Sequence, residues 1–296
     1  MTASELNVAV IVASLGRPDA LSALMVDLRM QTQKPDRIIL SVPSTSDLPA
    51  DLVSFPEVET ILAPRGSCVQ RNVALDRLGM SSDIVVFIDD DYVPSRFAIE
   101  RIADFFAANP DIAGATGHLL ADGANGPGID LEDARAMLAV YDGKPAPSPV
   151  VFRELHGLYG CNMAFRTKHL GSVRFDERLP LYGWQEDIDF SAQVRSHGPV
   201  VKTFAFAGVH RGIKAGRSAG IRVGYSQVVN PVYLVRKGTM RPRYALKIVA
   251  RNVCANCFRS FRPEPWVDRL GRGCGNWLGL VGVAFGRITP ERLQSL

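Results

Sequence analysis

The first 120 residues alternate between short, continuous apolar runs and longer segments with helical spacing. The apolar runs are typical of strands buried on both faces and predict strands at 8–14, 37–42, 58–63, 83–89 and 112–119. Apolar residues three and four positions apart predict helices between them, at 18–32, 67–79 and 95–109. This alternation is typical of an α/β fold, with a mostly parallel sheet and helices on both faces.

The pattern becomes less regular after residue 120. Residues 121–150 are rich in Gly, Pro, Asp and Ala and predict a loop excursion. The further elements predicted here are helices at 131–141 and 185–198, strands at 155–166 and 200–210, and a basic, glycine-rich loop over 211–224. Helices rich in arginine are expected from there to about residue 290.

Charge is distributed unevenly along the chain, although the net charge is only +4. Residues 210–296 contain 16 of the 34 Lys and Arg residues but 3 of the 30 Asp and Glu residues, a local charge of +13. The first 209 residues, with 18 basic and 27 acidic side chains, carry −9. A basic segment of this kind is typical of contact with nucleic acid, anionic lipid or a phosphorylated ligand.

The composition, 47% hydrophobic and 22% charged, is typical of a globular protein. The first apolar run has no basic segment before it and is interpreted as a strand, not a signal peptide. The run at 276–286 is shorter than the roughly 20 residues that cross a bilayer. Five scattered cysteines fit a reducing compartment, and Cys254 and Cys257 are interpreted as small apolar residues on one helix face. We therefore expect a cytoplasmic protein.

Three consecutive carboxylates, Asp89, Asp90 and Asp91, follow the apolar run of the fourth predicted strand. Ligands of open α/β sheets bind at the carboxyl ends of the strands. Because side chains alternate along an extended chain, Asp89 and Asp91 should share one side, with Asp90 on the other. Two carboxylates on one side suit Mg²⁺ or Mn²⁺. The alternative is a cap for the next helix, which would account for one acid and not three.

Motifs in a fixed order make the chain resemble the family 2 inverting glycosyltransferases of the GT-A fold. They are VASLGRP (12–18), QRN (70–72), VVFIDDDYVP (85–94), YGCNMAFR (159–166), FDERLPLYGWQEDIDF (175–190) and His210. The resemblance covers about residues 7–210 and implies a Rossmann-like GT-A catalytic domain over 1–221. Its nucleotide-sugar half would be about 1–120 and its acceptor half about 150–221. Residues 222–296 would form a basic helical extension, as in bacterial relatives that build exopolysaccharide or cell-envelope glycans.

The resemblance also implies a reaction, the transfer of a sugar from a nucleoside-diphosphate sugar to a hydroxyl of a glycan or lipid-linked acceptor. Asp91 and His210 would bind the Mg²⁺ or Mn²⁺, and an ordinary strand-end histidine is the alternative for His210. Asp187 would be the general base, beside Glu186 as an acceptor-binding or orienting residue. Trp184 would stack on an acceptor sugar. The alternative for the acids is a favourable charge in the first turn of a helix.

Residues from several segments would contact the sugar nucleotide. The resemblance places there Ser14, Arg17, Arg71, Asp89, Asp90, Gly160, Asn162 and Arg217. A helix-surface arginine is the alternative for Arg71. The family's second strand commonly ends in an Asp that contacts the nucleotide, and here Val42 or Pro43 stands in its place, with Ser41 or Asp47 as substitutes. The sequence therefore does not distinguish UDP, GDP and dTDP as the nucleotide of the donor.

The basic extension contains Trp266, Trp277, Leu278 and Phe285 among its arginines. Such helices predict peripheral binding to an anionic membrane surface, at the inner face of the cytoplasmic membrane; packing on the catalytic domain is the alternative. No nucleic-acid motif is present, so nucleic acid is not an expected partner.

Two other function classes compete with sugar transfer. A sugar-nucleotide nucleotidyltransferase would need a glycine-rich, basic signature after the first strand, which is absent. A non-catalytic scaffold in a polysaccharide assembly would not need both groups of carboxylates.

Overall fold

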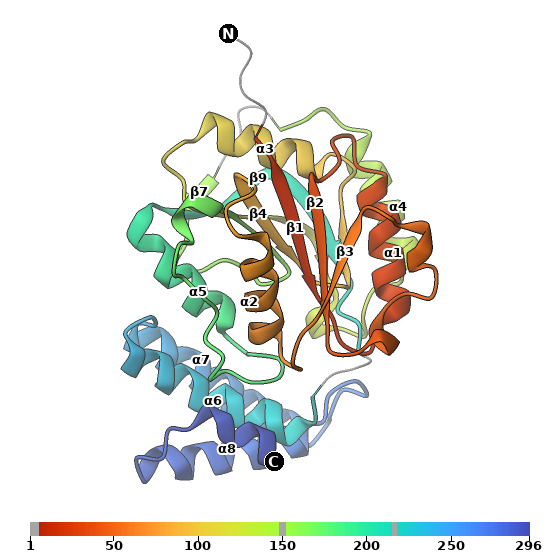
Figure 1. The fold of residues 1–296 in the computed structure, drawn as a ribbon. Helices are drawn as coiled ribbons and strands as arrows, with labels where there is room; N and C mark the ends of the chain where they lie inside the picture. The colour runs from red at the N-terminus through yellow and green to blue at the C-terminus, as the bar shows by residue number, and fades with distance from the viewer. Residues whose placement is uncertain (1–5, 148–151, 215–217) are drawn as a thin grey trace.

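A computed structural model describes residues 6–147, 152–214 and 218–296, and shows a twisted sheet between layers of helices (Figure 1). Its strand order is β3-β2-β1-β4-β8-β6-β9-β5, with β7 also paired to β9. The strands are β1 (Val8–Ala13), β2 (Arg37–Val42), β3 (Val58–Leu62), β4 (Ile84–Ile88), β5 (Tyr92–Pro94), β6 (Gly114–Asp122), β7 (Phe152–Glu154), β8 (Asn162–Arg166) and β9 (Val200–His210).

The sheet is mixed, although most of its strands share one direction. Parallel pairing joins β1, β2, β3 and β4, and also β6 to β9. Strands β5, β7 and β8 are antiparallel to their neighbours. Because β8 lies between β4 and β6, six of the nine strands in the described residues run the same way. The predicted α/β fold with a mostly parallel sheet is confirmed, with three antiparallel strands that the sequence pattern did not reveal.

Helices cover both faces of the sheet, as the alternating pattern predicted. Helices α1 (Pro18–Arg29) and α3 (Ala98–Ala108) pack on one face, and α2 (Ser67–Leu78) and α5 (Glu186–Val194) pack on the other. A further helix, α4 (Leu131–Asp142), covers β5 and the end of β9. The apolar residues of β1 alternate between the two cores, which explains why this run is apolar at every position.

Three predicted boundaries are wrong in ways that matter for the site. Only residues 162–166 of the predicted strand 155–166 form a strand, because the chain before them leaves the sheet and contacts α5, where Leu158 N–H donates to Ser191 Oγ. Strand β6 extends to Asp122, which the pattern had placed in a loop. The predicted loop 211–224 ends early, since residues from Gly220 onward are already helical.

The C-terminal helices pack against the region around α5. They are α6 (Gly220–Lys237), α7 (Pro242–Arg259) and α8 (Arg269–Ala284), and they lie together below the sheet (Figure 1). Lys237 at the end of α6 contacts Asp176 at 2.7 Å and Asp189 of α5 at 2.8 Å. Leu234 shares a core cluster with α2 and α5. No helix among the described residues combines the length and apolarity that crossing a membrane requires.

Candidate active site

Three potential metal ligands meet at the carboxyl end of β4. Side-chain ligand atoms of Asp89, Asp91 and His210 all lie within 4.8 Å of one another. Strand β5 continues directly from the acidic triplet and pairs with the last residues of β9, in a register that sets Tyr92 opposite His210. This pairing brings the histidine to the acids across more than a hundred residues of sequence. Two carboxylates and an imidazole form a donor set that suits Mn²⁺ or Mg²⁺.

The imidazole of His210 is held by a second carboxylate. Its Nδ1 lies 2.8 Å from Asp122 Oδ1, and its Nε2 lies 3.4 Å from Asp91 Oδ1. Burial alone lowers the pKa of His210, but the contacts with Asp122 and Asp91 outweigh it and raise the pKa to about 10. Without a cation the ring is therefore protonated at neutral pH, and its charge compensates the acids. A carboxylate on the far nitrogen is the usual arrangement behind a metal-binding histidine.

Asp90 points away from this group, toward the loop that follows β1. Its Oδ2 accepts a hydrogen bond from Ser14 Oγ at 2.5 Å, and its Oδ1 contacts Arg17 Nη1 at 2.8 Å. The same guanidinium nitrogen of Arg17 lies 3.5 Å from Asp91. Burial raises the pKa of Asp90 to about 6, while Arg17 opposes the shift. Asp90 thus holds Ser14 and Arg17 beside the metal group, a role that the sequence did not suggest; its direct contact with a donor stays a prediction.

Arg71 connects the metal group to a second acidic site. Its Nη2 donates to Asp89 Oδ1 at 2.8 Å, and its Nη1 donates to Glu186 Oε1 at 2.7 Å. Only 5% of its side chain is exposed. The helix-surface alternative for Arg71 is therefore wrong: the guanidinium lies buried between the two sites. Burial alone would lower its pKa, but Glu186 and Asp89 raise it.

The second acidic site begins α5, after a loop with unusual backbone geometry. Leu181 and Gln185 have φ angles of 58° and 76°, in the left-handed region where a non-glycine residue costs about 1–3 kcal/mol. Gly183, also left-handed, lies so close to α2 that a Cβ would stand 2.8 Å from Ser67 Oγ. This loop carries Trp184 and sets the direction in which Glu186 enters the site.

The two carboxyl groups that begin α5 are held differently. Glu186 is buried against Arg71, whereas Asp187 accepts hydrogen bonds from the backbone N–H groups of Gly160 and Ile188, at 3.1 and 2.8 Å. Burial, followed by repulsion from Asp187, raises the pKa of Glu186 to about 8, although Arg71 opposes the shift. Burial also raises the pKa of Asp187, and its backbone hydrogen bonds oppose this. Glu186 is therefore mostly protonated at neutral pH.

The structure brings the remaining predicted residues to the same region, with one exception. Gly160 borders the α5 acids, since a Cβ there would lie 3.5 Å from Asp187 Oδ2. Asn162 is buried and hydrogen-bonded to Thr116 and to the Tyr92 hydroxyl. Arg217 lies outside the described residues.

Sequence reasoning missed three residues of this region. Asp122 orients His210, and Tyr159 donates to Asp122 Oδ2 at 3.0 Å. Asn230 of α6 donates from Nδ2 to the backbone oxygen of Trp184 at 2.9 Å, so the extension supports the loop before α5. No local pattern distinguishes these residues, because their partners lie 37 or more positions away in sequence.

The two candidate substitutes for the missing nucleotide-contacting Asp are both buried. Asp47 Oδ1 accepts the backbone N–H of Gly16 at 2.7 Å, and Ser41 is fully buried. Asp47 therefore shapes the loop after β1, and the choice among nucleotides remains open.

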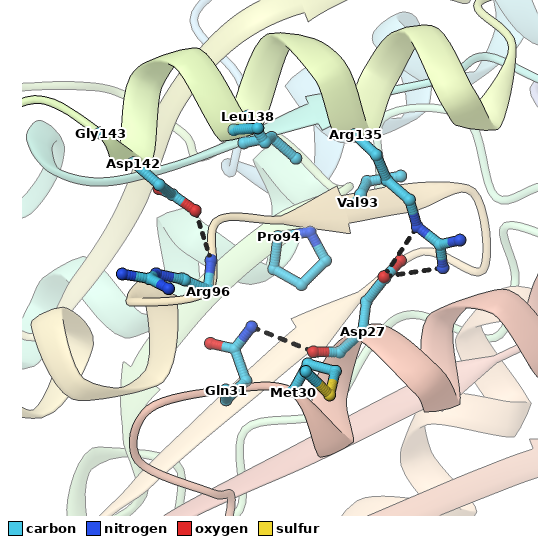
Figure 2. A pocket seen from close by; sticks show the side chains of 11 residues that line it. Asp27, Met30, Gln31, Val93, Pro94, Arg96, Arg135, Leu138, Asp142 and Gly143 are labelled. Atoms are coloured by element: carbon cyan, nitrogen blue, oxygen red, sulfur yellow. Dashed lines mark hydrogen bonds and ion pairs between the residues drawn. The ribbon is translucent and has the colours of Figure 1, made fainter.

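A separate pocket of about 430 Å³ lies between α1, β5 and α4 (Figure 2). Arg135 of α4 reaches Asp27 of α1 across it, at 2.8 Å, and Asp142 accepts the backbone N–H of Arg96 at 3.0 Å. None of the predicted site residues lines it. The acidic site is thus distinct from this pocket, which is lined by residues of α1, β5 and α4.

Comparison with solved structures shows that the fold is of the GT-A type. The S. aureus TarS fragment 1–349 matches with a TM-score of 0.55 and 16% identity, over 98% of this chain and 83% of that one. A mannosyltransferase from Pyrobaculum calidifontis, PcManGT, solved with GDP-Man and Mn²⁺, gives the same TM-score, identity and coverage. GalNAc-T7, solved with UDP, GalNAc and Mn²⁺, matches at 0.54 and 10%, over 99% of this chain and 56% of that chain.

No protein-family model matches the sequence, and no match is found among curated proteins. At identities of 10–16% the structural likeness establishes a fold and not an activity.

Proposed function

We propose that the protein is a metal-dependent, inverting glycosyltransferase that moves a sugar from a nucleoside-diphosphate sugar to a hydroxyl of a glycan or lipid-linked acceptor. The observation that carries the proposal is the position of Arg71. One buried guanidinium contacts both Asp89 of the metal group and Glu186, which stands next to Asp187 at the start of α5. The Arg71 side chain therefore connects a cation site to a pair of carboxyl groups with raised pKa values.

Asp89, Asp91 and His210 would hold the Mg²⁺ or Mn²⁺. Such an ion would neutralise the negative charge that develops on a departing nucleoside diphosphate. Two observations support the fit: Asp122 occupies the other ring nitrogen of His210, and the neighbours PcManGT and GalNAc-T7 were solved with Mn²⁺. The protonated ring of the metal-free site would lose its proton on binding the ion, because only a neutral imidazole nitrogen is a ligand.

Asp187 would be the general base. Glu186, with a pKa of about 8, is mostly protonated at neutral pH and cannot accept a further proton. Asp187 would take the proton of the acceptor hydroxyl while that oxygen bonds to the anomeric carbon and the bond to the diphosphate breaks. A single displacement of this kind inverts the anomeric centre. Trp184, on the loop before α5, would support the acceptor ring.

The order of the motifs supports a place among the family 2 enzymes of polysaccharide biosynthesis. The residues proposed to contact the donor remain Ser14, Arg17, Arg71, Asp89, Asp90, Gly160, Asn162 and Arg217. The neighbours were solved with GDP-Man, UDP-GlcNAc or UDP. We propose a donor of the same class, and the nucleotide is to be found by experiment.

A thermal-shift screen of UDP, GDP and dTDP with and without Mn²⁺ tests the donor class. One diphosphate should raise the unfolding temperature in a Mn²⁺-dependent way, and Asp91→Asn should remove that dependence. Asp187→Asn should keep the shift but abolish turnover of the matching sugar nucleotide. The exposed Asp104→Asn on α3 is the control and should behave as wild type. No shift with any nucleotide, or full turnover in either site variant, would refute the proposal.

A further inference from the structure

The outer face of α8 is apolar, which is the reverse of an ordinary surface helix. Leu270, Trp277 and Phe285 are 70%, 67% and 75% exposed. Cys274 and Leu280 are exposed on the same face, because their spacing follows the helical repeat. From Gly273 to Gly286 the sequence contains no charged residue. This 16-residue helix is about 24 Å long, so the exposed apolar strip extends over most of that length.

Glycines on the inner face of α8 let this helix approach α6 closely. A Cβ on Gly275 would lie 2.0 Å from the Ile221 backbone oxygen of α6, and a Cβ on Gly279 would lie 2.9 Å from Val228. Gly224 of α6 approaches Arg272 equally closely. The two helices can pack only with these glycines between them. The apolar strip is therefore fixed in its outward direction by backbone packing.

Exposed basic side chains lie on α7, which packs beside α8, and in the segment between the two helices. Arg243, Lys247, Arg251 and Arg262 are exposed, and the described residues offer none of them a carboxylate within ion-pair distance. Residues 210–296 carry 16 basic and 3 acidic residues. Phe258 and Phe261, at the end of α7 that leads to α8, are 73% and 85% exposed. The extension thus combines exposed positive charge with exposed aromatic and aliphatic side chains.

We propose that α8 and the basic residues of α7 dock the protein on an anionic lipid surface. Apolar side chains on a helix that does not span a bilayer, flanked by Lys and Arg, are the features of a helix that lies in the interface. Basic residues near an anionic membrane are attracted to its negative surface potential. A second copy of this chain fits the face poorly, because contact through it would bring two positive surfaces together.

Docking in this way also orients the proposed active site, a step that rests on the proposed function. Helix α6 lies between α8 and the loop before α5, and its Asn230 holds the backbone of Trp184. Arg178, just ahead of that loop in sequence, pairs with Glu291 after α8. The docked surface and the acceptor loop therefore belong to one packed unit. An acceptor carried by a membrane lipid would reach this loop from the docked side.

Vesicle sedimentation with the full chain tests the docking. Vesicles of phosphatidylcholine with about 30% phosphatidylglycerol should bind the protein, and about 0.5 M NaCl should weaken binding by screening the charges. Phosphatidylcholine alone should bind far less. Leu270→Gln/Trp277→Gln/Phe285→Gln should lower the affinity roughly a hundredfold. Arg243→Gln/Lys247→Gln/Arg251→Gln should lower it by a similar factor, with less sensitivity to salt.

Val53→Gln is the matched control, since Val53 is 90% exposed but belongs to the segment between β2 and β3. It should bind as wild type, and unchanged circular dichroism would show that the triple variants are folded. The proposal would be overturned by equal binding to both vesicle types or by equal binding of wild type and the apolar triple variant. It would also be overturned if light scattering showed a dimer that this variant abolishes. Nucleotide binding with Mn²⁺, measured without vesicles, separates failure of docking from failure of the proposed function.

Energy transfer tests the orientation. In Trp266→Phe/Trp277→Phe, Trp184 is the remaining tryptophan of the three in the chain. Its emission should be quenched by vesicles that contain a dansyl-labelled lipid, and Arg243→Gln/Lys247→Gln/Arg251→Gln added to this background should remove the quenching. Bound protein without quenching would show that the acceptor loop faces away from the membrane and would overturn the proposed orientation.

Discussion

Asp122 Oδ1 lies 2.8 Å from His210 Nδ1, at a position where β6 and β9 pair in register. A carboxylate accepts hydrogen bonds and does not donate them when ionised, so this contact places a proton on Nδ1. The other ring nitrogen, Nε2, faces Asp91 at 3.4 Å. The backbone pairing of two strands therefore fixes the direction and tautomer of the histidine in the proposed metal site.

Asp122→Asn should lower the affinity for Mn²⁺ about 10- to 100-fold, the usual cost of losing the partner of a metal-bound histidine. The affinity can be measured by the loss of the free Mn²⁺ signal in electron paramagnetic resonance. Asp104→Asn, on the exposed side of α3, removes the same charge and should leave the affinity unchanged. An unchanged affinity in Asp122→Asn would show that His210 does not ligate the ion through Nε2.

Arg71→Met should destabilise the protein by about 3–5 kcal/mol, because it removes the buried cation that pairs with Asp89 and the hydrogen bond that Arg71 donates to Glu186. Urea denaturation of the metal-free protein measures this free energy of unfolding. Arg77→Met, on the same helix, is the control: Arg77 is 63% exposed in its pair with Glu59, and its loss should cost at most about 1 kcal/mol. A similar loss in both variants would contradict the bridging role of Arg71.

The contrast between these two arginines shows what the sequence could and could not reveal. The periodicity of residues 67–79 predicts α2 correctly, but it places Arg71 and Arg77 on a helix without saying which one is buried. The same holds for Asp89 and Asp91, whose shared side follows from strand alternation, whereas the contact with His210 depends on pairing between β5 and β9.

Residues 155–166 show a case in which the sequence pattern predicts too long a strand. Their apolar pattern predicts one long strand, but residues 155–161 form no strand, and Gly157 packs against Ile188, where a Cβ would stand 2.5 Å from Cδ1. The end of the strand depends on close packing between segments that are distant in sequence. The hydrogen bond from Asn230 to the Trp184 backbone depends on such packing as well. Local patterns predict the core positions of apolar residues, and only the assembled fold shows which distant residues they contact and which polar side chains are buried.

Glu186→Gln should change how stability depends on pH. The pKa of Glu186 is raised from 4.5 to about 8 in the folded protein, so the folded state holds this proton more tightly than the unfolded state. The resulting stabilisation is complete below about pH 4.5 and is lost as the pH rises from there through about 8. Unfolding free energies between about pH 5 and 9, measured by urea titration without metal, should fall less steeply in Glu186→Gln than in wild type. Glu132→Gln, exposed on α4, should follow wild type; parallel slopes in all three would contradict a protonated Glu186.

Asn230→Ala should loosen the loop that carries Trp184 without weakening nucleotide binding. Asn230 is 3% exposed and donates to the Trp184 backbone oxygen, and an unmade buried hydrogen bond costs about 1–3 kcal/mol. In the Trp266→Phe/Trp277→Phe background, acrylamide should quench Trp184 more strongly in the variant, while the Kd for Mn²⁺ and the nucleotide stays the same. Asn252→Ala on α7, in the same extension but bonded to Gln227 and not to the loop, is the control. Unchanged quenching would mean that the contacts of the loop with α2 suffice to hold it, and that Asn230 of the extension does not.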